Sequence, residues 1–210
     1  MKPTPEDFEQ IAALTLAHYD QRALAFRDGT RDHDVSQNIE ALLEAIETTA
    51  PLTILDFGCG PGRDLETFTR LGHVATGLEG SPRLAAMACA ASGCDVLQQN
   101  FLGLDLPPSH FDGVFANAAL FHVPSQALPR VLNELHATLK PGGVLFSSNP
   151  RGQGQEGWSG ERYGVFHDLQ GWRVYMTAAG FTELGHYYRP PGLPFEQQPW
   201  LATLWRKPAS

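Results

Sequence analysis

A glycine-rich turn between a short apolar run and a charged helical pattern constrains this chain more than any other feature. Residues Ile54–Asp64 read ILDFGCGPGRD. Glycine lacks a Cβ atom, so the backbone can turn tightly there and a ligand can approach it closely. A helix that begins directly after the turn directs unpaired backbone N–H groups toward the same place. The segment therefore predicts a strand, a turn and a helix, with either a ligand site or only a tight connection at the turn.

Short apolar runs alternate with helical patterns along the rest of the chain. Such alternation predicts a parallel sheet with helices on both faces. The expected strands are residues 52–57, 73–78, 94–98, 111–116 and 143–148, with two later strands near 181–188 and 199–206. The expected helices are residues 62–71, 81–91, 126–139 and 168–179, and a glycine-rich loop is expected at 151–164.

The first fifty residues predict helices only. Apolar residues recur at helical spacing over residues 6–26, and Asp34 is placed to cap a second helix. We therefore expect one domain over residues 1–210, in which a helical lid at 1–50 precedes a Rossmann-like core at 51–210.

The acidic composition bears on the partners. The chain has 15 Lys and Arg against 23 Asp and Glu, a net charge of −8. Negative charge disfavours nucleic acid and anionic lipid as partners. The sequence contains no apolar run near the roughly 18 residues that a membrane span needs, and its start lacks the apolar core of a signal peptide. We expect a cytoplasmic protein with neither a nucleic-acid nor a membrane partner.

The cysteines do not indicate a metal site. Cys59, Cys89 and Cys94 are odd in number and show no CxxC spacing, which argues against a disulfide framework and a zinc ribbon. No H-E-x-x-H motif is present either, so no metal is expected.

A carboxylate follows the glycine-rich turn at an informative distance. Glu79 lies at the end of the next expected strand, about twenty residues past the glycines, where an acid can accept hydrogen bonds from both hydroxyls of a ribose. The glycines are spaced G-x-G-x-G and not G-x-G-x-x-G, the spacing typical of a pyrophosphate site. The pair predicts a ribose-containing ligand, although a solvated carboxylate at a strand end would look the same in isolation.

These segments together resemble a known family. Leu55–Asp64, Glu79, Phe111–Asn117 and Leu139–Leu145 are similar, in order and spacing, to the motifs of class I S-adenosylmethionine-dependent methyltransferases. The resemblance implies an α/β fold with a Rossmann-like, seven-stranded, mostly parallel sheet whose last strand is antiparallel. It also implies methyl transfer with S-adenosyl-L-methionine as the cofactor.

The resemblance implies a set of cofactor-binding residues. At Asn100 the family often has Asp, but an Asn carbonyl can accept the same hydrogen bond from an adenine amino group. The full set is Tyr19, Asp56, Gly58, Gly60, Arg63, Asp64, Glu79, Gly80, Ser81, Asn100, Phe101 and Asn117.

Segments near both ends of the chain resemble one subgroup. They are Tyr19–Ala23, Gly29–Asn38, Ser148–Gly152, Arg162–Gly164 and His186–Gly192. The subgroup is the ovothiol-forming methyltransferase, which methylates an imidazole nitrogen of 5-thiohistidine and often forms the C-terminal domain of 5-histidylcysteine sulfoxide synthase. The resemblance therefore implies 5-thiohistidine as the acceptor and this synthase as a partner.

An amino-acid acceptor needs a cation for its carboxylate and a hydrogen-bonding group for its ring. Asn117 and His122 are the candidate catalytic residues because they follow the fourth expected strand. The candidate substrate-binding residues are Arg31, Phe121, Asn149, Arg151, Tyr163, Tyr187 and Arg189. For each of these, a surface ion pair, a helix cap or ordinary packing stays open as an alternative.

Three other functions stay in view. A methyltransferase for another small molecule would keep every cofactor residue and change only the loops. A module that binds S-adenosylmethionine without catalysis is disfavoured, because it would not need these polar loops. A nicotinamide oxidoreductase is disfavoured because the third glycine of the pyrophosphate fingerprint is absent.

Overall fold

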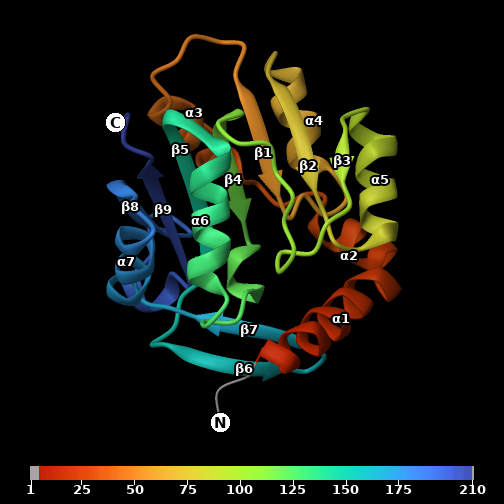
Figure 1. Ribbon diagram of the computed structural model, residues 1–210. Helices are drawn as coiled ribbons and strands as arrows, with labels where there is room; N and C mark the ends of the chain where they lie inside the picture. Colours follow the sequence, from red (N-terminus) through yellow and green to blue (C-terminus); the bar gives the residue numbers. More distant parts are fainter. Residues whose placement is uncertain (1–4, 210) are drawn as a thin grey trace.

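The computed structural model describes residues 5–209, and a seven-stranded sheet forms its centre (Figure 1). The strands lie in the order β3-β2-β1-β4-β5-β9-β8. Strands β1 to β5 run parallel, and β9 runs antiparallel to its neighbours β5 and β8. Their bounds are β1 Thr53–Phe57, β2 Val74–Leu78, β3 Val96–Leu97, β4 Phe111–Asn117, β5 Leu139–Pro150, β8 Thr182–Arg189 and β9 Trp200–Arg206. The predicted Rossmann-like fold class is confirmed.

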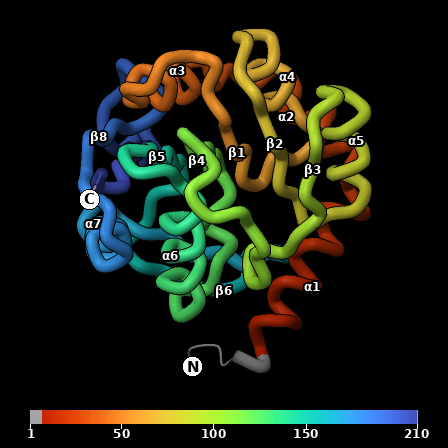
Figure 2. The backbone as a smooth tube through the Cα atoms, turned by 45° about the horizontal axis from the view of Figure 1, so that its top comes forward, coloured from red at the N-terminus to blue at the C-terminus, as the bar shows by residue number. Residues whose placement is uncertain are grey.

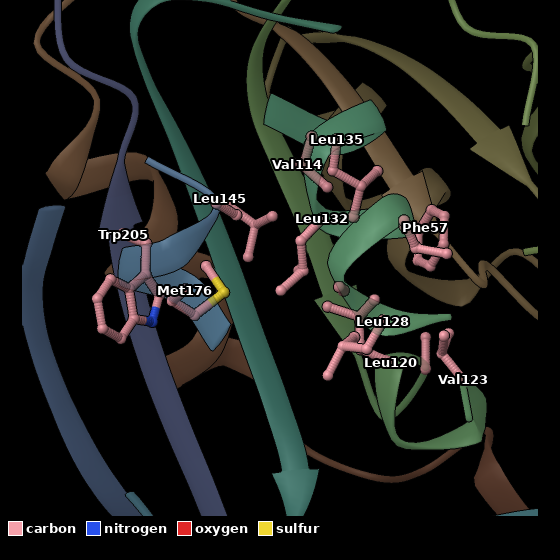
Figure 3. Close-up of a cluster of buried hydrophobic side chains, with 14 of the residues drawn as sticks. Phe57, Val114, Leu120, Val123, Leu128, Leu132, Leu135, Leu145, Met176 and Trp205 are labelled. Atoms are coloured by element: carbon pink, nitrogen blue, oxygen red, sulfur yellow. The ribbon is translucent and has the colours of Figure 1, made fainter. Parts of the chain in front are cut away.

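Helices cover both faces of this sheet. Helices α6 and α7 pack on one face, and α3, α4 and α5 pack on the other. On the first face, leucines at helical spacing in α6 and Met176 of α7 pack against Val114 and Leu145 of the sheet (Figure 3). The bounds are α3 Ser36–Ala45, α4 Arg63–Arg70, α5 Pro82–Ser92, α6 Leu128–Thr138 and α7 Leu169–Ala178. Each face buries a separate apolar cluster, as a two-sided parallel sheet requires.

The N-terminal helices and a separate hairpin lie beyond the carboxyl ends of the parallel strands. Helix α1 (Pro5–Gln21) contacts α5 and also β7 (Arg162–Phe166), and both views show it crossing beside the sheet (Figures 1 and 2). The short helix α2 (Ala23–Thr30) follows it. Strands β6 (Gln155–Ser159) and β7 form a separate hairpin next to α1.

Some expectations from the sequence are corrected by this arrangement. Residues 151–164, expected to be a loop, include most of the β6–β7 hairpin, because Tyr163 and Val165 of β7 bury their side chains against Ile11 of α1. The helix expected over residues 6–26 is split at Arg22, whose φ of −106° and ψ of 16° are not helical. The bend directs α2 toward the glycine-rich turn.

The remaining differences concern element ends. The strand expected at 94–98 is ordered only over Val96–Leu97, and the one expected at 143–148 extends over Leu139–Pro150. None of the helices described in residues 5–209 combines the length and apolar character of a membrane span.

Candidate functional site

A cavity of about 610 Å³ lies at the carboxyl ends of β1, β2 and β4, between these strands and the N-terminal helices. Its size is typical of a small-molecule site. In a parallel α/β sheet this edge is the usual place for a ligand, since the strand ends open into loops there. The glycine-rich turn, the loops after β2 and β4, α1, α2 and the end of β8 all contribute to its lining.

The backbone of the turn is shaped in a way that glycine alone readily allows. Gly58 has a φ of +80° and Gly60 a φ of +54°, in the left-handed region. A Cβ atom on Gly58 would lie 2.7 Å from the Cβ atom of Ala119, and one on Gly60 would lie 3.4 Å from the ring of Phe26. The turn thus leaves its backbone open to the cavity, which fits the predicted ligand site.

Glu79 lies in the lining of the cavity, beside the glycine-rich turn. Its side chain is 8% exposed, Oε2 accepts a hydrogen bond from Gly60 N at 3.0 Å, and Oε1 accepts one from Ser81 N at 2.8 Å. Burial raises the pKa of the Glu79 carboxyl, against the lowering effect of these backbone donors. Each carboxylate oxygen keeps a free lone pair for a ligand hydroxyl, so the geometry fits a ribose.

Two other predicted cofactor-binding residues, Asp56 and Ser81, lie near the cavity but outside its lining. Asp56 is 2% exposed, its Oδ2 has no partner among the described residues, and burial together with the charge of Asp64 raises its pKa well above the ordinary value. Ser81 caps α5, since its Oγ accepts a hydrogen bond from Leu84 N at 3.2 Å. Its role is to fix the loop that carries Glu79.

Helices α1 and α2 are tied to the cofactor side by hydrogen bonds. Asp20 Oδ1 accepts from Ser81 Oγ at 2.7 Å and from Arg83 N at 2.9 Å, so α1 helps to cap α5. Arg63 pairs with Asp64 at 2.7 Å and donates to the backbone oxygen of Thr30 at 2.9 Å, at the end of α2. These links hold the N-terminal helices over the cavity.

The other predicted cofactor residues also lie in the lining. Phe101 stacks on Phe57 with ring centroids 4.3 Å apart, and Asn100 Oδ1 accepts from Leu102 N at 3.0 Å. The predicted cofactor residues that line the cavity are Tyr19, Gly58, Gly60, Arg63, Asp64, Glu79, Gly80, Asn100, Phe101 and Asn117.

His122 and Tyr19 form a hydrogen-bonded pair in the lining of the cavity, and the ring of Tyr19 also contacts Phe26. His122 Nδ1 lies 2.6 Å from the backbone oxygen of Tyr163, which can only accept, so Nδ1 carries the proton. Its Nε2 therefore accepts from the Tyr19 hydroxyl at 2.8 Å. Burial lowers the pKa of His122 to about 4. Both ring nitrogens of His122, a predicted catalytic residue, are thus hydrogen-bonded within the protein.

Two residues at the far end of the sheet complete the lining. Arg189 of β8 pairs in register with Trp200 of β9, and both line the cavity. Arg189 Nη2 donates to the backbone oxygen of Asp34 at 2.8 Å, while its buried Nε has no hydrogen-bond partner among the described residues. A guanidinium group in a cavity lining is suited to a carboxylate.

Several predicted substrate residues are placed elsewhere. Arg151 stacks on Phe195 at 3.5 Å and donates to its backbone oxygen at 2.7 Å, so it holds the loop before β9. Arg31 is exposed beside Asp32. Of the predicted substrate residues, those outside the cavity lining are Arg31, Phe121, Asn149, Arg151, Tyr163 and Tyr187.

Some residues that the structure brings to the site are not among those predicted from the sequence. Phe26, Ser148 and Trp200 line the cavity, Asn38 holds Asn117 in the lining, and Asp20 holds Ser81 just outside it. Asn38 carried a signal, because an amide four residues before buried Leu42 stands where the helical spacing calls for an apolar side chain. The others carried none.

Comparisons with known proteins bear on the family and the fold. Residues 55–147 match the methyltransferase domain family. The chain is 28% identical over 148 residues to the 18S rRNA (guanine-N(7))-methyltransferase bud23 of Schizosaccharomyces pombe, covering 64% of this chain and 55% of that protein. It is 30% identical over 149 residues to a sterol 24-C-methyltransferase of Candida albicans, covering 66% of this chain and 38% of that protein. The chain thus spans about half the length of these relatives, or less.

A solved structure is similar along nearly the whole chain. It is the 1,6-didemethyltoxoflavin-N1-methyltransferase of Burkholderia thailandensis with bound 1,6-didemethyltoxoflavin and S-adenosylhomocysteine. The TM-score is 0.78 at 23% identity, covering 99% of this chain and 92% of the other. At this identity the similarity shows a shared fold, and together with the methyltransferase domain match it agrees with S-adenosylmethionine, the predicted cofactor. The chain has the fold of class I S-adenosylmethionine-dependent methyltransferases, and its residues 55–147 match a methyltransferase domain.

Proposed function

We propose that this protein transfers the methyl group of S-adenosylmethionine to an imidazole nitrogen of 5-thiohistidine. The observation that carries the proposal is a single cavity that joins Gly58, Gly60 and Glu79 on one side to Asn117 and Arg189 on the other. Such a cavity accommodates a cofactor and a small acceptor at once. The choice of 5-thiohistidine is supported by the resemblance of both terminal segments to the ovothiol-forming subgroup.

The residues present fit the cofactor in distinct roles. Glu79 would accept hydrogen bonds from the ribose, and the open backbone at Gly58 and Gly60 would lie against the cofactor. When bound, S-adenosylmethionine supplies an activated methyl group. Helices α1 and α2, tied down by Asp20 and Arg63, would exclude water from the transfer.

On the acceptor side the chain positions a neutral nucleophile. Imidazole has a pKa near 6.5, so its ring is largely neutral at about pH 7.5 and needs no strong base. His122 stays neutral with a pKa of about 4 and holds the Tyr19 hydroxyl at the cavity wall. Arg189 would bind the carboxylate of the amino acid. Positioning at about 3–3.5 Å from the methyl carbon supplies the rate.

Two of the compared proteins support nitrogen methylation, whereas the sterol 24-C-methyltransferase of Candida albicans is named for methylation at carbon. The Burkholderia thailandensis enzyme is named for methylation at N1 of a small heterocycle, and the Schizosaccharomyces pombe relative for methylation at N7 of guanine in rRNA. Both names describe a ring nitrogen. One relative is named for action on rRNA, so we propose, and do not conclude, that this protein has no nucleic-acid partner. The partnership with 5-histidylcysteine sulfoxide synthase is likewise part of the proposal.

Product analysis tests the proposal. The protein is incubated with methyl-labelled S-adenosylmethionine and, separately, with 5-thiohistidine, histidine, a sterol and total RNA, and the products are identified by mass spectrometry. We expect N-methylated 5-thiohistidine, with histidine poorer by about 10–200-fold because a fitted pocket discriminates a missing group by that much.

Other outcomes of the same assay contradict the proposal. Methylation on sulfur, or equal turnover of histidine and 5-thiohistidine, would indicate another small-molecule acceptor. Transfer of the labelled methyl group to RNA would indicate a nucleic-acid acceptor. Cofactor binding in calorimetry without turnover on any acceptor would indicate a binding module.

A further inference from the structure

Three polar side chains from distant parts of the chain form a hydrogen-bonded row beneath the acceptor side of the cavity. The Tyr187 hydroxyl lies 2.9 Å from Asn38 Oδ1, and Asn38 Nδ2 lies 3.0 Å from Asn117 Oδ1. Asn38 is 0% exposed. A buried amide is costly unless its groups are hydrogen-bonded, so this row calls for an explanation.

The sheet register places the ends of the row in line. Asn117 of β4 pairs with Ser148 of β5, Ser148 pairs with Ala202 of β9, and Ala202 pairs with Tyr187 of β8. Paired residues direct their side chains to the same face. The two residues between the ends, Ser148 and Ala202, are small. The row crosses three strand spacings, about 14 Å of sheet, and Asn38 of α3 lies in its middle on that face.

The hydrogen bonds in the row have one direction. The Tyr187 hydroxyl donates at one end of the row. Its nearer acceptor is Asn38 Oδ1 at 2.9 Å, against 3.4 Å to the backbone oxygen of Gln37. Because Oδ1 of Asn38 is occupied in this way, its Nδ2 faces Asn117 and donates to Asn117 Oδ1.

The direction decides what Asn117 offers to the cavity. Its Oδ1 is occupied by Asn38, and no described residue accepts a hydrogen bond from its Nδ2. Asn117 is half-buried and lines the cavity next to Ala118, whose φ of +60° is rare for a residue other than glycine. The amide hydrogens of Asn117 therefore remain for a ligand.

We propose that Asn38, held by Tyr187, is a positioning residue that keeps the amide nitrogen of Asn117 directed at the acceptor molecule. Asn117 then donates to the acceptor and cannot receive a ring N–H. Resting on the proposed function, the inference adds a specificity determinant: the thiolate form of 5-thiohistidine places a hydrogen-bond acceptor beside the ring nitrogen, and histidine lacks it. Asn117 would select for that sulfur.

Kinetics with two acceptors test this role. Tyr187→Phe removes the donor that sets the direction, and we expect kcat/KM for 5-thiohistidine to fall about fivefold, the equivalent of one net hydrogen bond. Turnover of histidine should change less, so the preference for 5-thiohistidine shrinks. Asn38→Asp accepts from both neighbours and turns the oxygen of Asn117 to the cavity, so we expect a loss of at least about tenfold. Tyr188→Phe, the matched control on the same strand, should leave both values unchanged.

Calorimetry with S-adenosylhomocysteine separates the acceptor from the cofactor. We expect its affinity for Tyr187→Phe to stay within about twofold of the wild-type value. If it fell as far as kcat/KM, Asn117 would be directed at the cofactor and the inference would be overturned. Wild-type selectivity in a folded Asn38→Asp variant would also overturn it.

A measurement without any acceptor keeps this inference separate from the proposed function. In the S-adenosylhomocysteine complex, Tyr187→Phe should shift the NMR signals of the side-chain amides of both Asn38 and Asn117, and Tyr188→Phe should shift neither. An unmoved Asn117 signal in Tyr187→Phe would refute the row. If the row holds and wild-type protein does not methylate 5-thiohistidine, only the proposed function fails.

Discussion

The proposed function assigns one side of the cavity, around Glu79, to the cofactor and the other, around His122 and Asn117, to the acceptor. The two sides are built in different ways. On the cofactor side, Glu79 is bonded to Gly60, nineteen residues earlier, and to Ser81, two residues later. On the acceptor side, Tyr19 is bonded to His122, 103 residues away, and Tyr187 to Asn38, 149 residues away. One side is a short local unit, and the other is assembled by the sheet.

The difference separates what each side can tolerate. The cofactor side depends on backbone shape and a single carboxylate, so substitutions there act on cofactor affinity directly. The acceptor side depends on side chains carried by loops, helices and strand ends, which can change while the scaffold stays the same. The same core can therefore serve different acceptors.

The largest expected effect concerns His122 on the acceptor side. Its folded pKa of about 4 lies below the ordinary value of 6.5, so the unfolded chain takes up a proton first as the pH falls. The stability that His122 contributes is therefore complete above pH 6.5 and is lost between pH 6.5 and 4, by about 3 kcal/mol.

Urea unfolding across this pH range measures the loss. In His122→Gln the fall in unfolding free energy between pH 6.5 and 4 should be smaller by that amount, while His33→Gln, an exposed histidine, should follow the wild type. Identical pH profiles for His122→Gln and the wild type would contradict the buried neutral histidine.

Next in size is the loss of the acid on the cofactor side. Glu79→Ala removes a buried acceptor of charge-assisted hydrogen bonds, worth about 1.5–3 kcal/mol, so affinity for S-adenosylhomocysteine should fall about 10–100-fold in calorimetry. Glu66→Ala, which removes an exposed acid from α4, is the control. Unchanged affinity in Glu79→Ala would remove the assignment of this side to the cofactor.

Arginines near the acceptor sharpen the comparison further. Arg189 lines the cavity, whereas Arg151 is stacked on Phe195 outside the lining. Arg189→Gln should raise KM for 5-thiohistidine about tenfold, and Arg151→Gln should leave it within about twofold. The sequence predicted both arginines to bind substrate, so equal effects would favour that reading over the geometry.

The smallest expected effect concerns Asp20, which links α1 to the start of α5 next to Glu79. Asp20→Ala removes the acceptor for Ser81 Oγ and Arg83 N, a contact like a helix cap and worth about 1 kcal/mol. Affinity for S-adenosylhomocysteine should fall about three- to fivefold, because α1 no longer steadies the loop of Glu79. Asp28→Ala, in an exposed pair with Arg27, should have no effect; if the two variants behaved alike, α1 would not be coupled to the cofactor.

The sequence alone determined the sheet, its helices and the glycine-rich turn with its nearby acid. Alternating runs, the glycines at 58 and 60 and the acid at 79 act through short-range backbone geometry, so their spacing along the chain carries the information. The resemblance to class I methyltransferases pointed to the cofactor for the same reason, since its motifs are local.

Only the tertiary structure decided the acceptor side. Arg151 and Arg189 look alike in the sequence, yet packing stacks one on Phe195 and leaves the other at the cavity. His122 was predicted from its place after β4, but its protonation follows from burial and from Tyr19 and Tyr163, which the fold brings from distant segments. Hydrogen bonds between side chains so far apart depend on the packing of the whole sheet, and no local pattern encodes them.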